Sequence, residues 1–395
     1  MNQMGFVPRH PPAPPPAAVK FSDDRGRFFR LVARGAALEL QTIGFYRFWL
    51  TTDIRRHLWA NTEVDGDAAE YTGLGKELLL GFLFALAILI PVYIAYFLVG
   101  VEAARLKAFA SFPLLAFFYL LGQFAIYRAR RYRLTRTVWR GVRFWMDGSG
   151  WSYAARSALW SCLVLFTLGF ALPWREAALE RYKMRHCHYG DLQGRFEGRG
   201  WDLFKRGWWI WLAAVGLLVL LGLRKYFTPA PLIVFAAAPF LYAVFKAVEW
   251  RWWISGLRFG AVRFESRLRQ GALVDLYWKV IGWSLLATAA FAVYLMLCTS
   301  LIVGTSKWAL AKLLITGHLQ DSLPILILAG LGYLAFILSP SAVRRIYLQR
   351  DLWDRVAAST VVHNLARARN VSAMGDIADA VGEGLADNFD VVAGF

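Results

Sequence analysis

His186, Cys187 and His188 come nearest in this chain to a metal-binding pattern. Alternate residues of a strand share one face, so the two histidines would lie side by side. A metal site needs three or four ligands, however, and no further histidine or cysteine is near in sequence. We interpret the three as polar residues on a surface strand, so the sequence predicts no metal site and no cofactor.

The short motifs of common enzyme classes do not occur in the sequence. It contains no HExxH zinc motif, no glycine-rich phosphate loop and no GxSxG nucleophile turn. We therefore predict that the protein is not an enzyme and has no catalytic residues.

Arginines between apolar stretches are the best candidates for binding. The chain has 45 Lys and Arg against 27 Asp and Glu, a net charge of +18. Basic residues beside membrane segments are attracted to anionic lipid by about 1 kcal/mol each. We predict that an anion or a lipid headgroup contacts six of them: Arg55, Arg56, Arg130, Arg131, Arg181 and Arg258. Since membrane topology accounts for the charge, nucleic acid is not an expected partner.

Four other ionisable residues lie in or beside apolar stretches. Arg34 and Glu39 would be functional candidates if their segment is embedded in lipid, but they fit an amphipathic surface helix as well. Glu77 and Asp202 stand at the head of two apolar runs. Each carboxylate would be stabilised by the positive end of a helix dipole, or the two could flank the mouth of a pathway.

The elements that must position these residues are apolar segments. The chain is 58% hydrophobic and only 18% charged, which is typical of an integral membrane protein. About 17 to 20 apolar residues suffice to cross a membrane. Six runs approach or exceed this length: Leu78–Val101, Phe109–Tyr127, Gly207–Leu223, Pro231–Phe245, Trp278–Val303 and Ser322–Leu338.

The sequence matches itself without gaps at an offset of about 125 residues. Matched pairs include Thr42 with Thr167, Gly44 with Gly169, Trp49 with Trp174, Gly73 with Gly198, and Gly75 with Gly200. Such self-similarity indicates an internal repeat. Glycines alternating just before a helix predict backbone with positive φ or a close approach between chains, and a loose loop is the alternative. We assign the four glycines and the two tryptophans a structural role.

These motifs resemble the YjgN-like family of bacterial inner-membrane proteins, a domain of unknown function. The resemblance rests on Thr167-Leu168-Gly169-Phe170, Pro173-Trp174, Arg55-Arg56, Asn61-Thr62, Asp65-Gly66, Tyr71 and Gly73, and extends over most of the chain. It implies a membrane location and adds no chemistry. Two departures stand out: Arg34, Glu39 and Gln41 replace apolar residues, and His186 and Cys187 replace the Asn-Thr pair.

Basic patches lie on both sides of two further segments, 36–50 and 155–174. If both flanks are cytoplasmic, each segment enters and leaves the membrane on one side, as a re-entrant or in-plane element. The six long runs then pair into three hairpins. The alternative makes 155–174 an ordinary span. The short, glycine-broken stretches between Thr62 and Tyr71 and between His186 and Phe196 predict small cytoplasmic hairpins.

We therefore expect an all-α polytopic membrane protein with six to seven transmembrane helices, internal repeats and small cytoplasmic β-hairpins. The expected organisation is a disordered proline-rich leader, two repeats, a third basic element with a helical hairpin, and a C-terminal helix with an acidic tail. In residue numbers these are 1–24, 25–127, 128–247, 248–345 and 346–395. The expected location is the bacterial cytoplasmic membrane, with both termini in the cytoplasm.

Two functions remain open from the sequence. The repeats and the re-entrant segments favour passage or binding of a solute or a lipid, because transporters share these features. The scarcity of charge within the long runs favours a non-catalytic scaffold or regulator of a membrane protein partner. Membrane lipids, above all anionic ones, are the expected partners in the first case.

Overall fold

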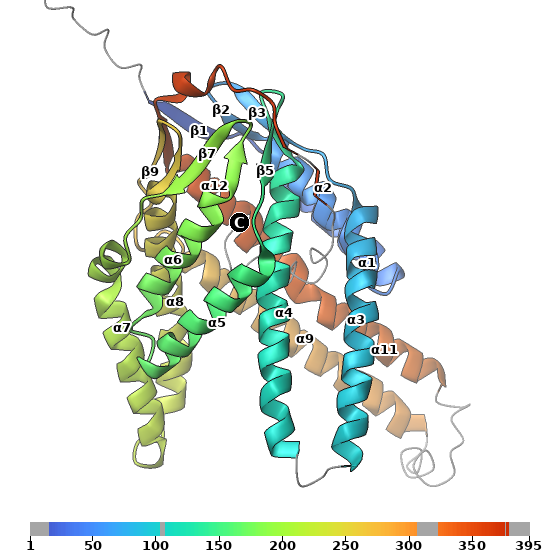
Figure 1. Cartoon of the computed structure of the whole chain (residues 1–395). Helices are drawn as coiled ribbons and strands as arrows, with labels where there is room; N and C mark the ends of the chain where they lie inside the picture. Colours follow the sequence, from blue (N-terminus) through green and yellow to red (C-terminus); the bar gives the residue numbers. More distant parts are fainter. Residues whose placement is uncertain (1–15, 103–106, 306–322, 376, 379–395) are drawn as a thin grey trace, which may run out of the picture.

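The computed structural model describes residues 16–102, 107–305, 323–375 and 377–378. Within them, ten short strands form a closed antiparallel barrel, and helices extend from one rim of it (Figure 1). Around the barrel the strand order is β1-β10-β9-β8-β7-β6-β5-β4-β3-β2. The first and last strands of the chain are therefore neighbours, and their pairing closes the ring.

Four hairpins with matching strand and loop lengths supply eight of the ten strands. Each consists of a three-residue strand, a two-residue turn and a five-residue strand. The hairpins are β2 (Thr62–Val64) with β3 (Asp67–Tyr71), β4 (Thr137–Trp139) with β5 (Val142–Met146), β6 (Cys187–Tyr189) with β7 (Leu192–Phe196), and β8 (Leu257–Phe259) with β9 (Val262–Ser266). The Asp65-Gly66 turn has positive φ at both residues, as tight hairpins between twisted strands require. The chain ends supply β1 (Ala17–Phe21) and β10 (Thr360–His363).

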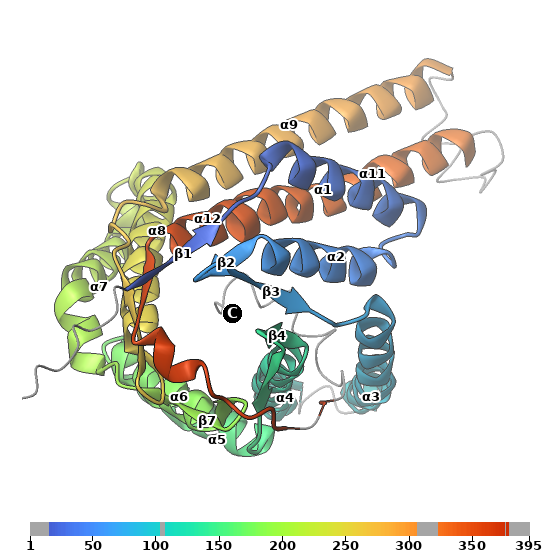
Figure 2. The ribbon, with the colours of Figure 1, turned by 90° about the horizontal axis from the view of Figure 1, so that it is seen from above.

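Helices connect the strands outside the barrel and follow one another in pairs along the chain (Figures 1 and 2). Two pairs are short: α1 (Arg25–Gln41) with α2 (Arg47–Ala60), and α5 (Gly150–Phe166) with α6 (Leu172–Arg185). Three are long: α3 (Gly75–Glu102) with α4 (Lys107–Thr135), α7 (Gly200–Gly222) with α8 (Ala230–Gly256), and α9 (Val274–Thr305) with α11 (Leu323–Arg344). The π-helical segment η2 (Arg345–Asp351) and α12 (Leu352–Ala358) lead from α11 to β10.

Apolar side chains from all ten strands fill the barrel. Trp139, Tyr189, Val262 and Val362 are its buried centre. The rings of Phe144 on β5 and Phe259 on β8 lie 5.9 Å apart although their strands are not neighbours. Such a contact is possible only through the interior. The segment after β10, which includes the short helix η3 (Leu365–Ala368), packs on the same cluster.

The all-α prediction is wrong, because the hairpins are not separate small elements. An isolated hairpin leaves unpaired backbone groups along both edges, and pairing edge to edge satisfies them. β3 pairs with β4, β5 with β6, and β7 with β8, and the chain ends complete the circle. Residues 17–21, assigned from the sequence to a disordered leader, form β1 in this ring. Residues 1–15 and most of the acidic tail lie outside the described residues.

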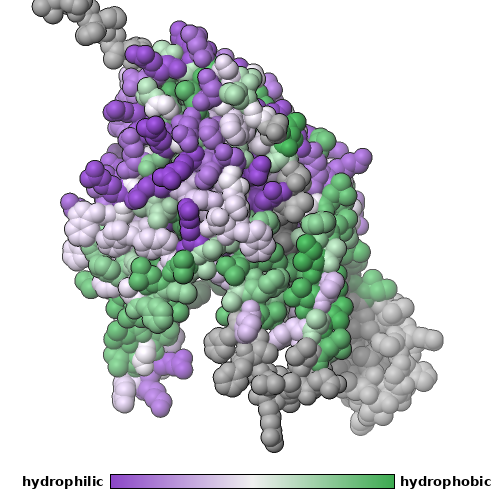
Figure 3. All heavy atoms as spheres, viewed as in Figure 1, coloured by the Kyte–Doolittle hydropathy of each residue, from purple (hydrophilic) through white to green (hydrophobic). Residues whose placement is uncertain are grey.

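Five helices in the described part of the chain are long and apolar enough to cross a membrane, where the sequence predicted six or seven spans. They cover Gly75–Leu98, Gly200–Lys225, Ala230–Gly256, Val274–Cys298 and Ile327–Ala358. The remaining predicted run, 109–127, lies within α4 and is not among these five helices. Phe84, Phe97 and Leu232 are among the large apolar side chains exposed on these helices. On the face shown in Figure 3, the part of the helices away from the barrel is mostly apolar and the barrel part is mostly polar, as in a membrane protein.

The two segments interpreted as re-entrant or in-plane, 36–50 and 155–174, form the bends of the two short helix pairs. Each pair leaves the barrel and returns to it, so both of its ends lie on the barrel side (Figure 1). At about 1.5 Å per residue, the 17-residue helices α1 and α5 are about 25 Å long, shorter than the long helices beside them.

Candidate functional site: a cationic cavity at the first short helix pair

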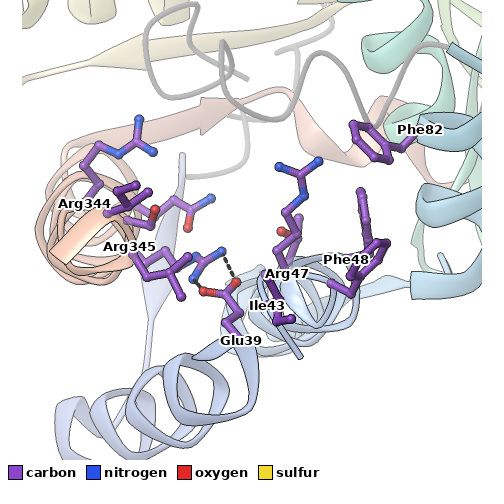
Figure 4. Close-up of a pocket in the computed structure, with 14 residues that line it drawn as sticks. Glu39, Ile43, Arg47, Phe48, Phe82, Arg344 and Arg345 are labelled. Atoms are coloured by element: carbon purple, nitrogen blue, oxygen red, sulfur yellow. Dashed lines mark hydrogen bonds and ion pairs between the residues drawn. The ribbon is translucent and has the colours of Figure 1, made fainter. Parts of the chain in front are cut away.

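A cavity of about 450 Å³ opens at the bend between α1 and α2. α3 and the end of α11 complete its wall, and η2 contributes two residues (Figure 4). Its charged lining residues are Glu39, Arg47, Arg344 and Arg345. Among the described residues that line it, the net charge is therefore +2. Such a cavity favours an anion.

The bend itself is a tight turn that places its side chains in fixed directions. Ile43 and Gly44 have φ values of 52° and 85°. The Gly44 amide donates to the Glu39 carbonyl at 2.6 Å, and the Tyr46 amide donates to the Thr42 hydroxyl at 2.9 Å. The matching bend between α5 and α6 has the same geometry. There Leu168 and Gly169 have φ of 49° and 86°, and the Ala171 amide donates to the Thr167 hydroxyl at 3.1 Å.

Glu39 is only 1% exposed, and its carboxylate is bound by one guanidinium. Arg345 donates from Nη1 to Oε2 at 2.9 Å and from Nη2 to Oε1 at 2.7 Å. This two-point geometry is the one in which arginine also binds phosphate. The pair joins α1 to the residue that follows α11, across 306 positions of sequence.

Arg47 faces the cavity from α2, opposite Arg344 and Arg345 (Figure 4). Its guanidinium carbon lies 4.7 Å from the centre of the Phe48 ring and 4.6 Å from that of Phe82. Stacking on two aromatic faces helps to orient the guanidinium. Thr51, Ser341 and Gln349 add polar groups to the same wall. The Oε1 atom of Gln349 is buried and has no hydrogen-bond partner.

The rim of the cavity is apolar and exposed. Ile43 and Phe45 at the bend are 74% and 54% exposed, and Ile337 on α11 is 49% exposed. A cationic interior behind an exposed apolar rim is the arrangement that suits an amphiphile, with its charged end inside and its apolar part outside.

The six arginines predicted from the sequence are not gathered in this cavity. Arg55 donates to the Tyr71 hydroxyl at 3.1 Å, and Arg56 donates to the Gly73 carbonyl at 2.8 Å. Arg258 binds Glu197 and two backbone carbonyls. Three of the six thus tie helix ends and strands together. Arg181 is exposed and Arg131 is partly buried.

Arg130, the remaining member, belongs to a buried ion cluster on α4 and α6. Its Nη1 lies 3.3 Å from Oε2 of Glu180, and Lys183 binds the same carboxylate. Burial alone would raise the pKa of Glu180, but the two cations lower it to about 2. The cluster links α4 to α6 and has a structural role.

The predicted glycines are sites of close approach, and none of the four has positive φ. A Cβ atom on Gly75 would lie 2.8 Å from the Trp49 Cα, and one on Gly200 would lie 2.8 Å from the Trp174 Cα. Gly73 and Gly198 are packed in the same way against the rings of Tyr71 and Phe196. The first residue of a long helix therefore rests on the backbone of the short helix before it.

The histidine pair forms no metal site in the described structure, which holds no group of three potential ligands. His186 binds Asp147 at 2.7 Å, and the His188 ring stacks on Trp145 at 4.1 Å. Cys187, which stands between them in sequence, is buried in a core cluster with Met184 and Phe196, so its interpretation as a surface residue was wrong. Burial raises the pKa of its thiol to about 12.

The carboxylates at the head of two long helices differ in their surroundings. Glu77 accepts hydrogen bonds from Tyr132 and Arg136, each at 2.6 Å. Asp202 is exposed. Neither lines the cationic cavity. Arg34 lies on α1 with Arg27 and Arg30, in a second hollow of about 390 Å³ between α1 and α2.

Sequence reasoning singled out Glu39 but not Arg47, Arg344 or Arg345 as its neighbours in a site. The signal was available in part, because Arg344 and Arg345 begin the basic stretch after the last apolar run. Their distance from Glu39 in sequence hid the pairing.

Comparison with known proteins gives a family and nothing beyond it. Searches of curated proteins and of solved structures found no match. A model of a family described as "Bacterial protein of unknown function (DUF898)" matches residues 16–228, more than half of the chain. The match begins at β1 and ends just after α7, so it includes both short helix pairs. The chain belongs to this family, the YjgN-like family that its motifs resemble.

Proposed function

We propose that this protein binds anionic lipids in the cytoplasmic membrane of bacteria and holds the lipid headgroup in the cavity between α1, α2, α3 and α11. The observation that carries the proposal is the placement of Arg47, Arg344 and Arg345 around one cavity with an exposed apolar rim. A phosphate group would receive charge-assisted hydrogen bonds there, while the acyl chains remain among the apolar helices.

The barrel is proposed to lie on the cytoplasmic side. Basic helix ends gather at the barrel, among them Arg128–Arg136 at the end of α4 and Arg344–Arg350 at the end of α11 and in η2. The bias of Lys and Arg toward the cytoplasm supports this orientation. Both ends of the described chain are at the barrel, since β1 pairs with β10. Reporter fusions after Arg181 and Arg350 should therefore both report cytoplasm, and a fusion near Thr228 should report the outside.

Lipid binding is tested with the full chain in mild detergent, titrated with phosphatidylglycerol and, separately, phosphatidylcholine, and measured by native mass spectrometry. Phosphatidylglycerol should bind more tightly. Arg47→Gln and Arg344→Gln should each weaken its binding, because each removes one of three positive charges from the cavity.

Arg195→Gln is the matched control, since it removes the same charge from an exposed position on β7. It should bind phosphatidylglycerol like the unmodified protein. If all three variants bound phosphatidylglycerol equally weakly, the net charge of the protein would explain the loss, and the proposed site would be overturned. Equal affinity for the two lipids would favour the scaffold role instead.

A further inference from the structure

The second short helix pair carries a cavity in the same place as the first. It also has a volume of about 450 Å³ and lies at the bend between α5 and α6, against α7 and α8. Six lining positions correspond to those of the cationic cavity at an offset of 125 residues. Leu168, Gly169, Phe170, Leu172, Pro173 and Gly207 stand where the first cavity has Ile43, Gly44, Phe45, Arg47, Phe48 and Phe82.

The chemistry of the two cavities is opposite. Arg47 is replaced by Leu172, and none of the described residues that line the second cavity is charged. Its polar groups are few, and the indole Nε1 of Trp211 already donates to the Leu168 carbonyl at 3.0 Å. An anion would lose its hydration there without gaining a partner. The occupant must therefore be apolar.

The matching positions on the long helices α3 and α7 carry side chains of very different size. In the first cavity the Phe82 ring fills the position on α3, under the Arg47 guanidinium. In the second, Gly207 occupies the matching position on α7, and no atom lies within 4 Å of where its Cβ would be. The base of the cavity is well packed, because Leu203 and Ile210 belong to a buried core cluster with residues of α8.

We infer that this second cavity binds a hydrocarbon chain of a membrane lipid, with no selection for the headgroup. α7 and α8 are long and apolar enough to cross a membrane, so hydrocarbon is the medium around them. A partner's helix is about 10 Å across and would not enter a hollow bounded by the α5–α6 bend and two helices. A flexible chain can enter it. The inference rests on the membrane location and not on the headgroup proposal.

The test uses the full chain in nanodiscs of phosphatidylcholine that contain a trace of the same lipid with a diazirine in one acyl chain. After illumination, labelled peptides are mapped by mass spectrometry. Labelling should concentrate around Leu168–Phe170 and Gly207–Val215. Phosphatidylglycerol with the same diazirine chain should label these peptides equally.

Gly207→Phe restores the ring that the first cavity has and should lower labelling of the cavity peptides several-fold. Ala238→Phe fills the cavity from α8 and should act in the same way if Gly207→Phe fails to fold. Gly216→Phe is the matched control. It lies on the same helix with open space around its Cβ position and does not line the cavity.

Unchanged labelling in both filled variants, or labelling spread evenly along the exposed faces of α7 and α8, would overturn the inference in favour of ordinary lipid contact. Cross-links to a second copy of the chain at Leu168–Phe170 would overturn it in favour of a dimer contact. Arg344→Gln should leave the labelling unchanged, which separates this site from the headgroup site.

Discussion

The carboxylate of Glu39 occupies both donors on one edge of the Arg345 guanidinium, at 2.7 and 2.9 Å, inside the cationic cavity. These are the donors that a phosphate would use. Glu39 would therefore compete with the proposed anionic headgroup for the same arginine. The matching residue in the second short helix pair is Val164, so the competitor is present only where the cavity is cationic.

Glu39→Gln should raise the affinity for phosphatidylglycerol by about tenfold, equivalent to about 1.4 kcal/mol, because it removes the only negative charge among the described lining residues. Titration followed by native mass spectrometry measures the change. Glu70→Gln, at an exposed position of the barrel, is the control and should leave the affinity unchanged. A folded Glu39→Gln protein with equal or lower affinity would show that Glu39 organises the cavity instead of competing.

The apolar segments and the helix bends could be read from the sequence, but the barrel could not. Length and composition are enough to locate a long apolar helix, and Asp65-Gly66 is a strong local turn signal. Barrel closure depends on pairing between strands that are far apart, such as β1 with β10. A three-residue strand carries too little periodicity to indicate its partner. The Glu39–Arg345 pair was hidden for the same reason.

Asp23 links α2, near the start of the described chain, to η2, near its end. Its replacement should therefore destabilise the whole fold. Its carboxylate, 1% exposed, binds His57 at 2.7 Å and Arg350 at 2.8 Å. Asp23→Asn removes one of the two carboxylates that bind the buried guanidinium of Arg350, which keeps Asp351, and should lower the free energy of unfolding by about 2 kcal/mol. Thermal unfolding in detergent measures the effect.

The neighbouring residue provides the control for that experiment. Asp24 is exposed and caps α1 by accepting from the Gly26 amide at 2.9 Å. Asparagine caps helices as well as aspartate does, so Asp24→Asn should be nearly silent. Equal loss in both variants would mean that net charge near the first helix matters and the buried contact does not.

Glu180 should make stability depend on pH in the acid range. Its pKa of about 2 is below that of an unfolded glutamate, about 4.3. The unfolded state therefore binds the proton first as the pH falls, and stability is lost between about pH 4.5 and pH 2. Glu180→Gln has no proton to take up and should lose less stability than the unmodified protein over this window. Identical pH profiles for the two proteins would contradict the role assigned to the Arg130–Glu180–Lys183 cluster.

Gly75 and Gly200 should be intolerant even of alanine, and to the same degree. At both positions a Cβ would lie 2.8 Å from a backbone Cα, that of Trp49 or that of Trp174, and backbone cannot give way as the end of a flexible side chain can. Gly75→Ala and Gly200→Ala should each cost about 1–3 kcal/mol of stability, as overpacking does. Gly216→Ala on α7 has open space and should be neutral or stabilising, because alanine favours helix more than glycine does. Thermal unfolding of the three variants in one detergent compares them directly. If only one of the two glycines is sensitive, the two short helix pairs do not support their long helices equally. The insensitive pair would then be free to move against its long helix.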